Sequence, residues 1–474
     1  MKVRTRFAPS PTGFMHLGGL RTALYAYLYA KHNDGDFILR VEDTDQGRYV
    51  EGAVELIYSS LKQSGMVYDE GPDVGGNYGP YTQSERKDIY DKYAKKLVEL
   101  GGAYYCFCSK ERLETLTDKN GNRKYDKHCL KLSKEEVEEK IKNGEPYVIR
   151  QNIPSEGVSS YNDLIYGTIE VDYNELEDNI LIKSDGMPTY NFANVIDDHL
   201  MGITHVIRGT EYLSSTPKYN LMYDAFGWER PVYIHLPPIM KDATRKLSKR
   251  YGDANFDDFV KKGYVEEAII NYVALLGWCP KNNLEKMTME EMIENFDLTG
   301  ISKSQSIFDE VKCRWLNGEY LKMMDDDEFV KRATPFLNEK LLSLDVNKVC
   351  KLVKSRVEIL SEINDKLDFL VDFNAPISEL YENNKQKSTV ELAKKVIPLI
   401  INKIPEITEF KNDVIFSTLQ ELAVSLEIKA KTLFYIMRIA ISGLEVTPGG
   451  ATELAEILGK EECIIRLTKA LENI

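Results

Sequence analysis

The N-terminal segment combines residue types that suit phosphate binding. Pro9, Pro11 and Gly13 end a short strand-like run, and His16-Leu17-Gly18-Gly19 follows where a helix is predicted to begin. Free N–H groups and the helix dipole favour negative charge at a helix N-terminus, and glycine lets a phosphate approach the backbone closely. His16 can donate to a phosphoryl oxygen. The spacing fits neither a Walker loop nor GxGxxG, and a glycine pair before a helix is also ordinary punctuation.

A second cluster of charged residues lies far along the chain. Lys246-Leu247-Ser248-Lys249-Arg250 follows Thr244-Arg245 and places several cations in a short, Gly-flanked stretch. Phosphoryl chemistry needs positive charge where negative charge builds on the phosphates, so this loop could clamp pyrophosphate. A solvated basic turn is the simpler alternative for an isolated motif. The two motifs together favour a nucleotide site.

Cysteines form a third candidate site. Cys106 and Cys108 are one residue apart, and Cys129 follows about twenty residues later. Three thiolates at such spacing are a plausible frame for zinc, although C-x-C is less specific than C-x-x-C. The alternative is three buried or free thiols without a metal.

The elements around the first motif predict a parallel sheet. Val3, Thr5 and Phe7 alternate with arginines, an apolar face of a helix runs over about 18–32, and 37–41 forms a second short strand. This β-loop-α-β order is the start of a doubly wound, Rossmann-type domain. Helices are predicted over 51–63 and 84–100, strands return at 205–208 and 232–236, and the chain is nearly all helical from 265 onward. Apolar residues step by three and four from 349 to 370.

Length and composition bound the remaining possibilities. A chain of 474 residues is too long to fold around one core. Its composition, 43% hydrophobic and 29% charged, is too apolar for a disordered protein. No stretch is long and apolar enough for a membrane span, and no signal-like segment follows the N-terminus. Seven cysteines predict a reducing, cytoplasmic location. The net charge of −14 does not exclude nucleic acid, because residues 331–474 hold 20 basic and 21 acidic residues.

Taken together, the motifs resemble those of a known enzyme family. PSPTG followed by HLGG, with KLSKR some 230 residues later, is similar to the HIGH and KMSKS signatures of class I aminoacyl-tRNA synthetases. Gly19, Leu247 and Arg250 depart from the ideal letters, as is typical of one branch. That branch is the bacterial-type glutamyl-tRNA synthetases. Segments 7–13, 41–45, 79–84, 183–190, 193–199 and 206–209 also fit it, so the resemblance covers most of residues 1–320.

The resemblance implies the substrates and their contacts. The amino-acid pocket would be formed by Arg6, Ala8, Ser10, Glu42, Tyr190, Asn194 and Arg208. Arg6 and Arg208 would bind the side-chain carboxylate of glutamate, because the guanidinium fork matches a carboxylate. Glu42 would pair with the α-ammonium group.

The same resemblance implies how the reaction proceeds. ATP would be held by His16, Gly18, Gly19, Lys246, Ser248 and Lys249, of which His16, Lys246 and Lys249 would be catalytic. The glutamate carboxylate attacks the α-phosphorus of ATP and expels pyrophosphate as its Mg²⁺ salt, and the ribose of the terminal adenosine of tRNA then attacks the adenylate. Positioning and charge neutralisation suffice, without an enzyme nucleophile. Lys249→Ala is expected to slow adenylate formation strongly.

Some members of the family carry zinc with the pattern C-x-C, then Y-x-x-x-C. Tyr125 and Cys129 reproduce this pattern after Cys106 and Cys108. Lys131 stands where other members have a histidine, so Tyr125 or His128 would be the fourth ligand.

The resemblance also implies a domain order. The catalytic domain would comprise 1–105 and 186–240, separated by an insertion at 106–185 that binds the tRNA acceptor end and holds the zinc site. Residues 241–324 would contact the tRNA stem and carry the KLSKR loop, and 325–474 would be a helical anticodon-binding domain. Lys351, Lys354 and Arg356, on one predicted helix, could meet the anticodon, although a solvated face is the alternative for each. The expected partners are L-glutamate and tRNA(Glu), and the expected state is a monomer. Whether tRNA(Gln) is charged as well depends on anticodon-contacting side chains that the sequence does not place.

Two other functional classes compete with this interpretation. A glutamine-specific relative would end in β-barrels, whereas this C-terminal part is helical. A small-molecule nucleotidyltransferase, or a truncated tRNA-modifying paralogue, would not need the C-terminal helices at all.

Overall fold

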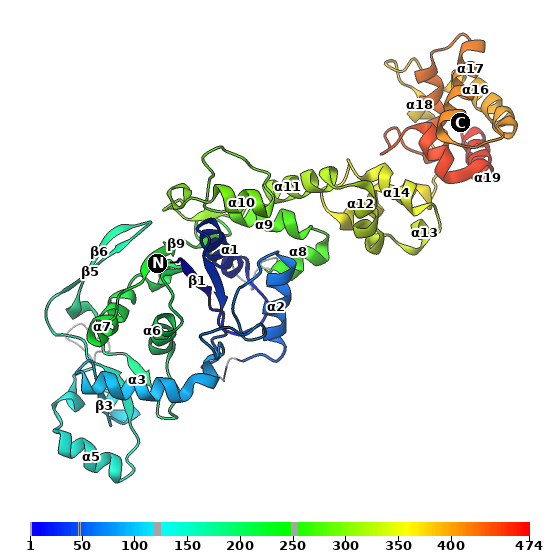
Figure 1. The fold of residues 1–474 in the computed structure, drawn as a ribbon. Coiled ribbons are helices and arrows are strands. Elements are labelled where there is room, and N and C mark those ends of the chain that lie inside the picture. The colour runs from blue at the N-terminus through cyan, green and yellow to red at the C-terminus, as the bar shows by residue number, and fades with distance from the viewer. Residues whose placement is uncertain (1, 46, 48, 117–124, 248–254) are drawn as a thin grey trace. The chain divides into compact units, whose positions relative to one another are not determined.

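The computed structural model describes residues 2–45, 47, 49–116, 125–247 and 255–474. The chain forms two units, Met1–Phe259 with Ile269–Asp309, and Val260–Ala268 with Glu310–Ile474. Figure 1 colours them along the chain from blue to red. None of the described helices combines the length and the apolar character of a membrane span.

The first unit mixes strands and helices. Its strands are β1 (Arg4–Phe7), β2 (Asp36–Leu39), β3 (Ala103–Cys106), β4 (Val148–Gln151), β5 (Val158–Asp163), β6 (Gly167–Asp172), β7 (Ile180–Ile182), β8 (His205–Gly209), β9 (Val232–Leu236), β10 (Ile239–Met240) and β11 (Ser306–Ile307). Its helices are α1 (Leu17–His32), α2 (Ala53–Gln63), α3 (Lys87–Glu99), α4 (Lys110–Glu114), α5 (Lys134–Lys142), α6 (Tyr190–Leu200), α7 (Thr216–Phe226) and α10 (Met289–Asn295). The chain passes between the units at α8 (Phe256–Lys262) and α9 (Glu266–Leu275).

A parallel sheet lies at the centre of this unit, as predicted. β1 pairs in parallel with β2 across α1, and β8 pairs in parallel with β9 across α7. β8 lies beside β1, where the Thr204 N–H donates to the Arg4 carbonyl at 3.0 Å. The two halves therefore wind away from the β1–β8 pair. In open α/β sheets such a switch point leaves a crevice at the carboxyl ends of the strands, where ligands bind.

Helix α1 forms because one of its faces is apolar. Leu20, Ala23, Leu24, Tyr27 and Leu28, which define that face in the sequence, are all buried. This burial fixes the start of the helix, and with it the HLGG segment, against the sheet. The predicted helices near 51–63 and 84–100 correspond to α2 and α3, and the predicted strands at 205–208 and 232–236 correspond to β8 and β9.

The region predicted as an insertion, 106–185, contributes to two sheets. β4 pairs antiparallel with both β3 and β7. β5, in contrast, pairs antiparallel with β6 and in parallel with β9 of the central sheet, with Asp163 opposite Tyr233. Asp163, which belongs to this region, therefore lies beside β9, and β9 is the neighbour of β8, the strand that carries the predicted pocket residue Arg208.

The second unit is helical around its own apolar core. Its helices are α11 (Glu310–Met323), α12 (Asp326–Ala333), α13 (Glu339–Leu342), α14 (Val346–Val353), α15 (Ile363–Leu367), α16 (Val390–Lys403), α17 (Asn412–Ser425), α18 (Ala430–Ser442) and α19 (Ala451–Glu472).

The apolar period at 349–370 is broken in the structure. α14 ends at Val353 and α15 begins at Ile363, although Val357 and Leu360 between them are still buried. The Leu360 N–H donates to the Gly263 carbonyl, and the Glu358 carbonyl accepts from Asn317. Tertiary hydrogen bonds therefore take backbone groups that a continuous helix would use. Arg356 accordingly lies beyond the helix that carries Lys351, and the prediction of one shared helix for these basic residues was wrong.

Candidate active site

A cavity of about 710 Å³ lies at the switch point of the sheet. Arg6 reaches it from β1, Glu42 from the segment after β2, and Arg208 from the end of β8. Tyr190 enters from the first turn of α6. Six of the seven residues implied for the amino-acid pocket line this one cavity, namely Arg6, Ala8, Ser10, Glu42, Tyr190 and Arg208.

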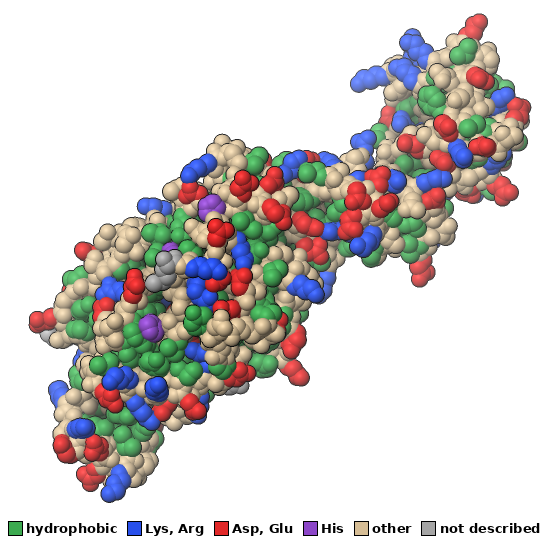
Figure 2. All heavy atoms as spheres, viewed as in Figure 1, with side chains coloured by type: hydrophobic (Ala, Val, Ile, Leu, Met, Phe, Trp, Pro, Cys, Tyr) green, Lys and Arg blue, Asp and Glu red, His purple; other side chains and the backbone are tan. Residues whose placement is uncertain are grey.

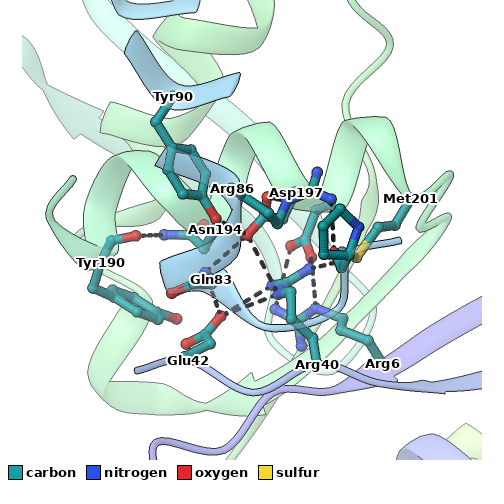
Figure 3. Close-up of polar contacts among 12 residues, drawn as sticks. Arg6, Arg40, Glu42, Gln83, Arg86, Tyr90, Tyr190, Asn194, Asp197 and Met201 are labelled. Carbon is teal, nitrogen blue, oxygen red and sulfur yellow. Dashed lines mark hydrogen bonds and ion pairs between the residues drawn. The ribbon is translucent and has the colours of Figure 1, made fainter. Parts of the chain in front are cut away.

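The seventh residue, Asn194, is buried behind the cavity wall. Its Nδ2 donates to the Tyr190 carbonyl at 2.6 Å, and its side chain is not among those that line the cavity. Figure 3 shows this contact at the start of α6. In this geometry Asn194 fixes the backbone from which Tyr190 projects.

A buried ionic network holds Arg6 and Glu42 in place (Figure 3). Asp198 accepts from Arg6 Nε at 3.0 Å and from Arg40 Nη1 at 2.8 Å, and Arg40 Nη2 donates to Glu42 at 3.1 Å. Asp197 joins the network and accepts from Arg86 Nε at 2.7 Å. Arg40 and Asp197 are 0% exposed. Charges withdrawn this far from water require such pairing, because an unpaired buried ion costs several kcal/mol.

The network sets the ionisation of its carboxyl groups in different ways. Burial raises the pKa of Glu42 to about 7, against the opposing effects of Arg40 and Arg6. Burial alone would also raise the pKa of Asp198, but the guanidinium groups of Arg6 and Arg40 hold it below its ordinary value. Asp198 therefore stays ionised as a fixed counter-charge, whereas Glu42 titrates near neutral pH.

The two arginines of the pocket differ in how their charge is balanced. Arg6 donates from Nε and Nη2 to Asp198 and from Nη1 to the Ile207 carbonyl. Arg208 donates to two neutral groups, and within the described part of the chain it forms no ion pair with a carboxylate. Its guanidinium carbon lies 4.9–5.5 Å from the ring centroids of three tyrosines, Tyr212, Tyr219 and Tyr233. A buried cation without a counter-charge is suited to an anionic ligand.

The predicted phosphate site lies at the start of α1. His16 is the N-cap residue, and its Nδ1 accepts from the Gly18 N–H at 3.0 Å. Because Nδ1 accepts, a neutral imidazole carries its hydrogen on Nε2. Gly19 lines the cavity, and a Cβ at this position would meet nothing within 4 Å. The glycine therefore leaves open space between the helix start and the pocket.

The described residues include only the first part of the second predicted motif, Lys246–Arg250. Lys246 is exposed and pairs with Met240 in an isolated β-bridge, and it is not among the residues that line the cavity. Ser248 and Lys249 lie outside the described residues, so their roles stay predictions.

The three cysteines of the candidate metal site converge. The Sγ atoms of Cys106, Cys108 and Cys129 lie within 4.8 Å of one another. The Tyr125 hydroxyl is 3.3 Å from Cys106 Sγ and 3.4 Å from Cys108 Sγ. His128 is exposed and does not belong to this cluster.

Two arginines face the cysteine cluster. Arg150 Nε donates to Cys106 Sγ at 3.3 Å, and Arg112 Nη1 donates to Cys108 Sγ at 3.4 Å. Burial would raise the pKa of Cys106, but hydrogen bonds from Tyr125 and Arg150 hold it below its ordinary value, whereas burial and the neighbouring thiols raise the pKa of Cys108 to about 11. The thiolate is the form that binds metals. Converging thiolates with one further oxygen donor fit the four-coordinate sites that zinc prefers.

Some basic residues of the second unit are paired with carboxylates, and others are not. Lys354 and Lys351 both pair with Asp326, at 2.8 and 3.4 Å, so their charge is balanced internally. Four exposed lysines, Lys385, Lys387, Lys429 and Lys431, form no ion pair within the described residues, and the Lys431 ammonium donates to the Lys385 carbonyl. Figure 2 shows basic side chains gathered at the end of this unit, near α18.

Sequence reasoning missed the residues behind the pocket. The buried ionic residues Arg40, Asp197 and Asp198 were not predicted to have a role at the site. The same is true of three residues that line the cavity, namely Lys183, Glu211 and Tyr212. One signal was present, since two adjacent acids follow the segment 192–196, in which four of five residues are apolar. Acids within a buried helix need buried cations as partners.

Comparison with known proteins places the chain in a family. Residues 2–315 match the family described as tRNA synthetases class I (E and Q), catalytic domain, and residues 328–471 match the anticodon binding domain family. The chain is 57% identical to the Glutamate--tRNA ligase of Clostridium botulinum (strain Eklund 17B / Type B), covering 99% of both proteins. It is 54% identical to that of Clostridium kluyveri, covering 100% of this chain and 98% of the relative.

A solved structure supports the same assignment. The crystal structure of a glutamate tRNA ligase from Elizabethkingia meningosepticum in complex with its amino acid superposes with a TM-score of 0.87. It is 37% identical and covers 100% of this chain and 99% of that one. The chain belongs to the glutamate--tRNA ligase family of the class I tRNA synthetases.

Proposed function

We propose that the protein ligates L-glutamate to the 3′ end of tRNA(Glu), through a glutamyl-adenylate, and releases AMP and diphosphate. Full-length similarity to glutamate--tRNA ligases is the observation that carries this proposal. As a member of this family the protein is a ligase that uses ATP. The helical second unit, with its match to an anticodon binding domain, argues against the small-molecule nucleotidyltransferases and truncated paralogues.

We infer that the cavity binds glutamate between opposite charges. Arg208, together with Arg6, would take the side-chain carboxylate, and Glu42 would take the α-ammonium group. The unbalanced charge of Arg208 supports this orientation, because a bidentate carboxylate would neutralise it. Ala8, Ser10 and Tyr190 would shape the rest of the pocket, with Asn194 holding Tyr190.

ATP would lie beside this pocket at the start of α1. His16 would donate from Nε2 to a phosphate, and Gly18 and Gly19 would allow the phosphates to approach the helix. Lys246, Ser248 and Lys249 would neutralise the departing pyrophosphate. Mg²⁺ would be bound through the phosphates themselves, as is usual for nucleotide substrates. The amino-acid carboxylate is then the only nucleophile that the first step needs.

The proposed domain boundaries follow the sequence prediction. Residues 1–105 and 186–240 would form the catalytic domain, 106–185 the insertion for the acceptor end, 241–324 the stem-contact domain and 325–474 the anticodon-binding domain. Contact of tRNA with Lys385, Lys387, Lys429 and Lys431 is supported by their exposed, unbalanced charge, because phosphates dominate nucleic-acid affinity. A monomeric state and a cytoplasmic location are proposed from the family resemblance. Charging of separate purified tRNAs decides whether tRNA(Gln) is a substrate besides tRNA(Glu).

Aminoacylation with separate purified tRNAs tests the function. We expect labelled glutamate, and not glutamine, to be transferred to tRNA(Glu). Transfer of glutamate to tRNA(Gln) as well would show that the enzyme does not discriminate between the two tRNAs. Formation of an adenylate without transfer to any tRNA would instead support one of the rejected classes.

The raised pKa of Glu42 predicts a pH dependence. Only the ionised carboxylate can pair with the substrate ammonium group, so kcat/KM for glutamate should rise about tenfold per pH unit below the pKa of about 7 and level off above it. Pyrophosphate exchange between pH 6 and 8.5 measures this profile. Glu42→Gln should give lower values without the step near 7. A flat wild-type profile over this range would refute the assignment of Glu42.

We also propose a structural zinc ion bound by Cys106, Cys108, Cys129 and Tyr125. Protein purified without chelator should contain about one zinc per chain by elemental analysis, as expected for a closed structural site. Cys129→Ser should lose the metal, and Tyr125→Phe should release it at lower chelator concentration. His128→Ala is the matched control and should retain wild-type zinc. Wild-type content well below one per chain would show that the thiols bind no zinc.

A further inference from the structure

Arg208 is held by a chain of buried polar groups that reaches away from the pocket. Its Nε donates to His235 Nε2 at 3.1 Å, and His235 Nδ1 lies 2.7 Å from Asp163 Oδ2. His235 is 0% exposed, Asp163 is 1% exposed and Arg208 is 5% exposed. The chain therefore runs through the interior of the sheet, where each donor requires an acceptor.

Strand pairing explains why these residues meet. Arg208 and His235 are directly opposite each other in the β8–β9 register, and Asp163 ends β5, which pairs with β9 near Tyr233. Asp163 is itself fixed by backbone N–H groups. Its Oδ1 accepts from Ile165 and Tyr166 at 2.9 and 2.8 Å, and its Oδ2 accepts from His235 N at 3.1 Å. The carboxylate is thus a rigid anchor for the imidazole.

The chemistry at the two ends determines the state of His235. An ionised carboxylate only accepts, so Nδ1 must carry a hydrogen, and a guanidinium only donates, so Nε2 must accept. Only a neutral imidazole with its hydrogen on Nδ1 meets both conditions. Burial lowers the pKa of His235, which favours the neutral form against the opposing effect of Asp163.

The remaining contacts of Arg208 show what this arrangement achieves. Nη2 donates to Thr216 Oγ1 at 2.7 Å, so Nε and one Nη2 hydrogen are taken by neutral acceptors. Three of the five N–H hydrogens of a guanidinium remain for a ligand. Arg208 is therefore oriented without losing its net charge to a protein carboxylate, in contrast to Arg6.

We propose that His235, oriented by Asp163, is a positioning residue for recognition of the glutamate side chain. It fixes the plane of the Arg208 guanidinium and leaves its charge for the substrate carboxylate. A carboxylate placed directly against Arg208 would orient it equally well but would neutralise it, and selection for a negative side chain would weaken. The inference rests on the proposed role of Arg208 as a glutamate contact.

Two substitutions at one position separate positioning from packing. The amide of glutamine falls near the Nε2 position of histidine, and the amide of asparagine falls near the Nδ1 position. His235→Gln can therefore accept from Arg208 but loses Asp163, whereas His235→Asn keeps Asp163 but leaves Arg208 Nε without its acceptor. We expect His235→Asn to raise KM for glutamate about tenfold, the value of one lost hydrogen bond to a charged group. His235→Gln should return KM to within about threefold of wild type, and KM for ATP should be unchanged in both.

Each other outcome overturns the proposal. If neither variant changes KM for glutamate, His235 does not position Arg208. If both raise it equally, or only His235→Gln does, the residue serves packing or Asp163. Arg208→Lys is measured in parallel. An unchanged KM for glutamate in that variant would refute the contact of Arg208 with glutamate, on which the role of His235 rests, whereas a raised KM in Arg208→Lys together with an unchanged KM in His235→Asn would refute the positioning role alone.

A measurement on the unmodified protein covers the case in which a variant does not fold. ¹⁵N spectra of the full chain labelled at its six histidines report which ring nitrogen is protonated. We expect the His235 signal, assigned by its contacts to Arg208, to show Nδ1–H between pH 6 and 8. An Nε2–H or doubly protonated ring would overturn the proposal.

Discussion

Arg208→Gln is expected to lower kcat/KM for glutamate by about three orders of magnitude in pyrophosphate exchange. Among the described residues that line the pocket, the substitution removes the guanidinium that no carboxylate of the protein balances. Loss of one partner of a buried charge pair costs about 2–5 kcal/mol, and each 1.4 kcal/mol is a factor of ten in rate. Discrimination against glutamine should fall in parallel, since the variant no longer prefers a negative side chain.

Arg6→Gln is the matched comparison. The charge of Arg6 is already balanced by Asp198. Its removal should therefore lower the preference for glutamate over glutamine less than removal of Arg208 does, even where activity falls. KM for ATP should stay near wild type in both variants. An Arg208→Gln enzyme with normal selectivity for glutamate would show that Arg208 does not contact the side-chain carboxylate.

Asp198→Asn is expected to destabilise the first unit by about 3–5 kcal/mol, as found when one member of a buried ionic network is removed. The carboxylate serves Arg6 and Arg40 together, at 3.0 and 2.8 Å, and all three side chains are almost fully buried. Its loss leaves two buried guanidinium groups with less counter-charge. KM for glutamate should also rise, because Arg6 loses the partner that orients it.

Asp224→Asn provides the control for this effect. Asp224 also accepts two hydrogen bonds from a single arginine, Arg230, but its side chain is 45% exposed. Water can replace the partner there, so the loss should stay below about 1 kcal/mol. Urea denaturation of both variants, followed by a probe in the first unit, gives the comparison. Equal effects of the two substitutions would show that burial of the network contributes little to stability.

Much of the fold was predictable because local patterns dictated it. Alternation at 3–7 and the apolar face of 18–32 gave β1 and α1, since each pattern buries one side of one element. The pattern at 349–370 failed, because burial alone does not require a continuous helix. Leu360 and Glu358 satisfy their backbone groups with Gly263 and Asn317, which no local pattern reveals.

The sequence by itself determined the family, six of the seven residues implied for the amino-acid pocket and the cysteines that converge. These depend on residue types at fixed spacing near the ends of predictable strands. Only the tertiary structure decided how their charges are balanced. Asp198 neutralises Arg6 from 192 positions away, whereas Arg208 is held by a neutral His235. Electrostatic partners across a fold are set by distance in space and by burial, and a linear sequence contains neither until the strands are paired.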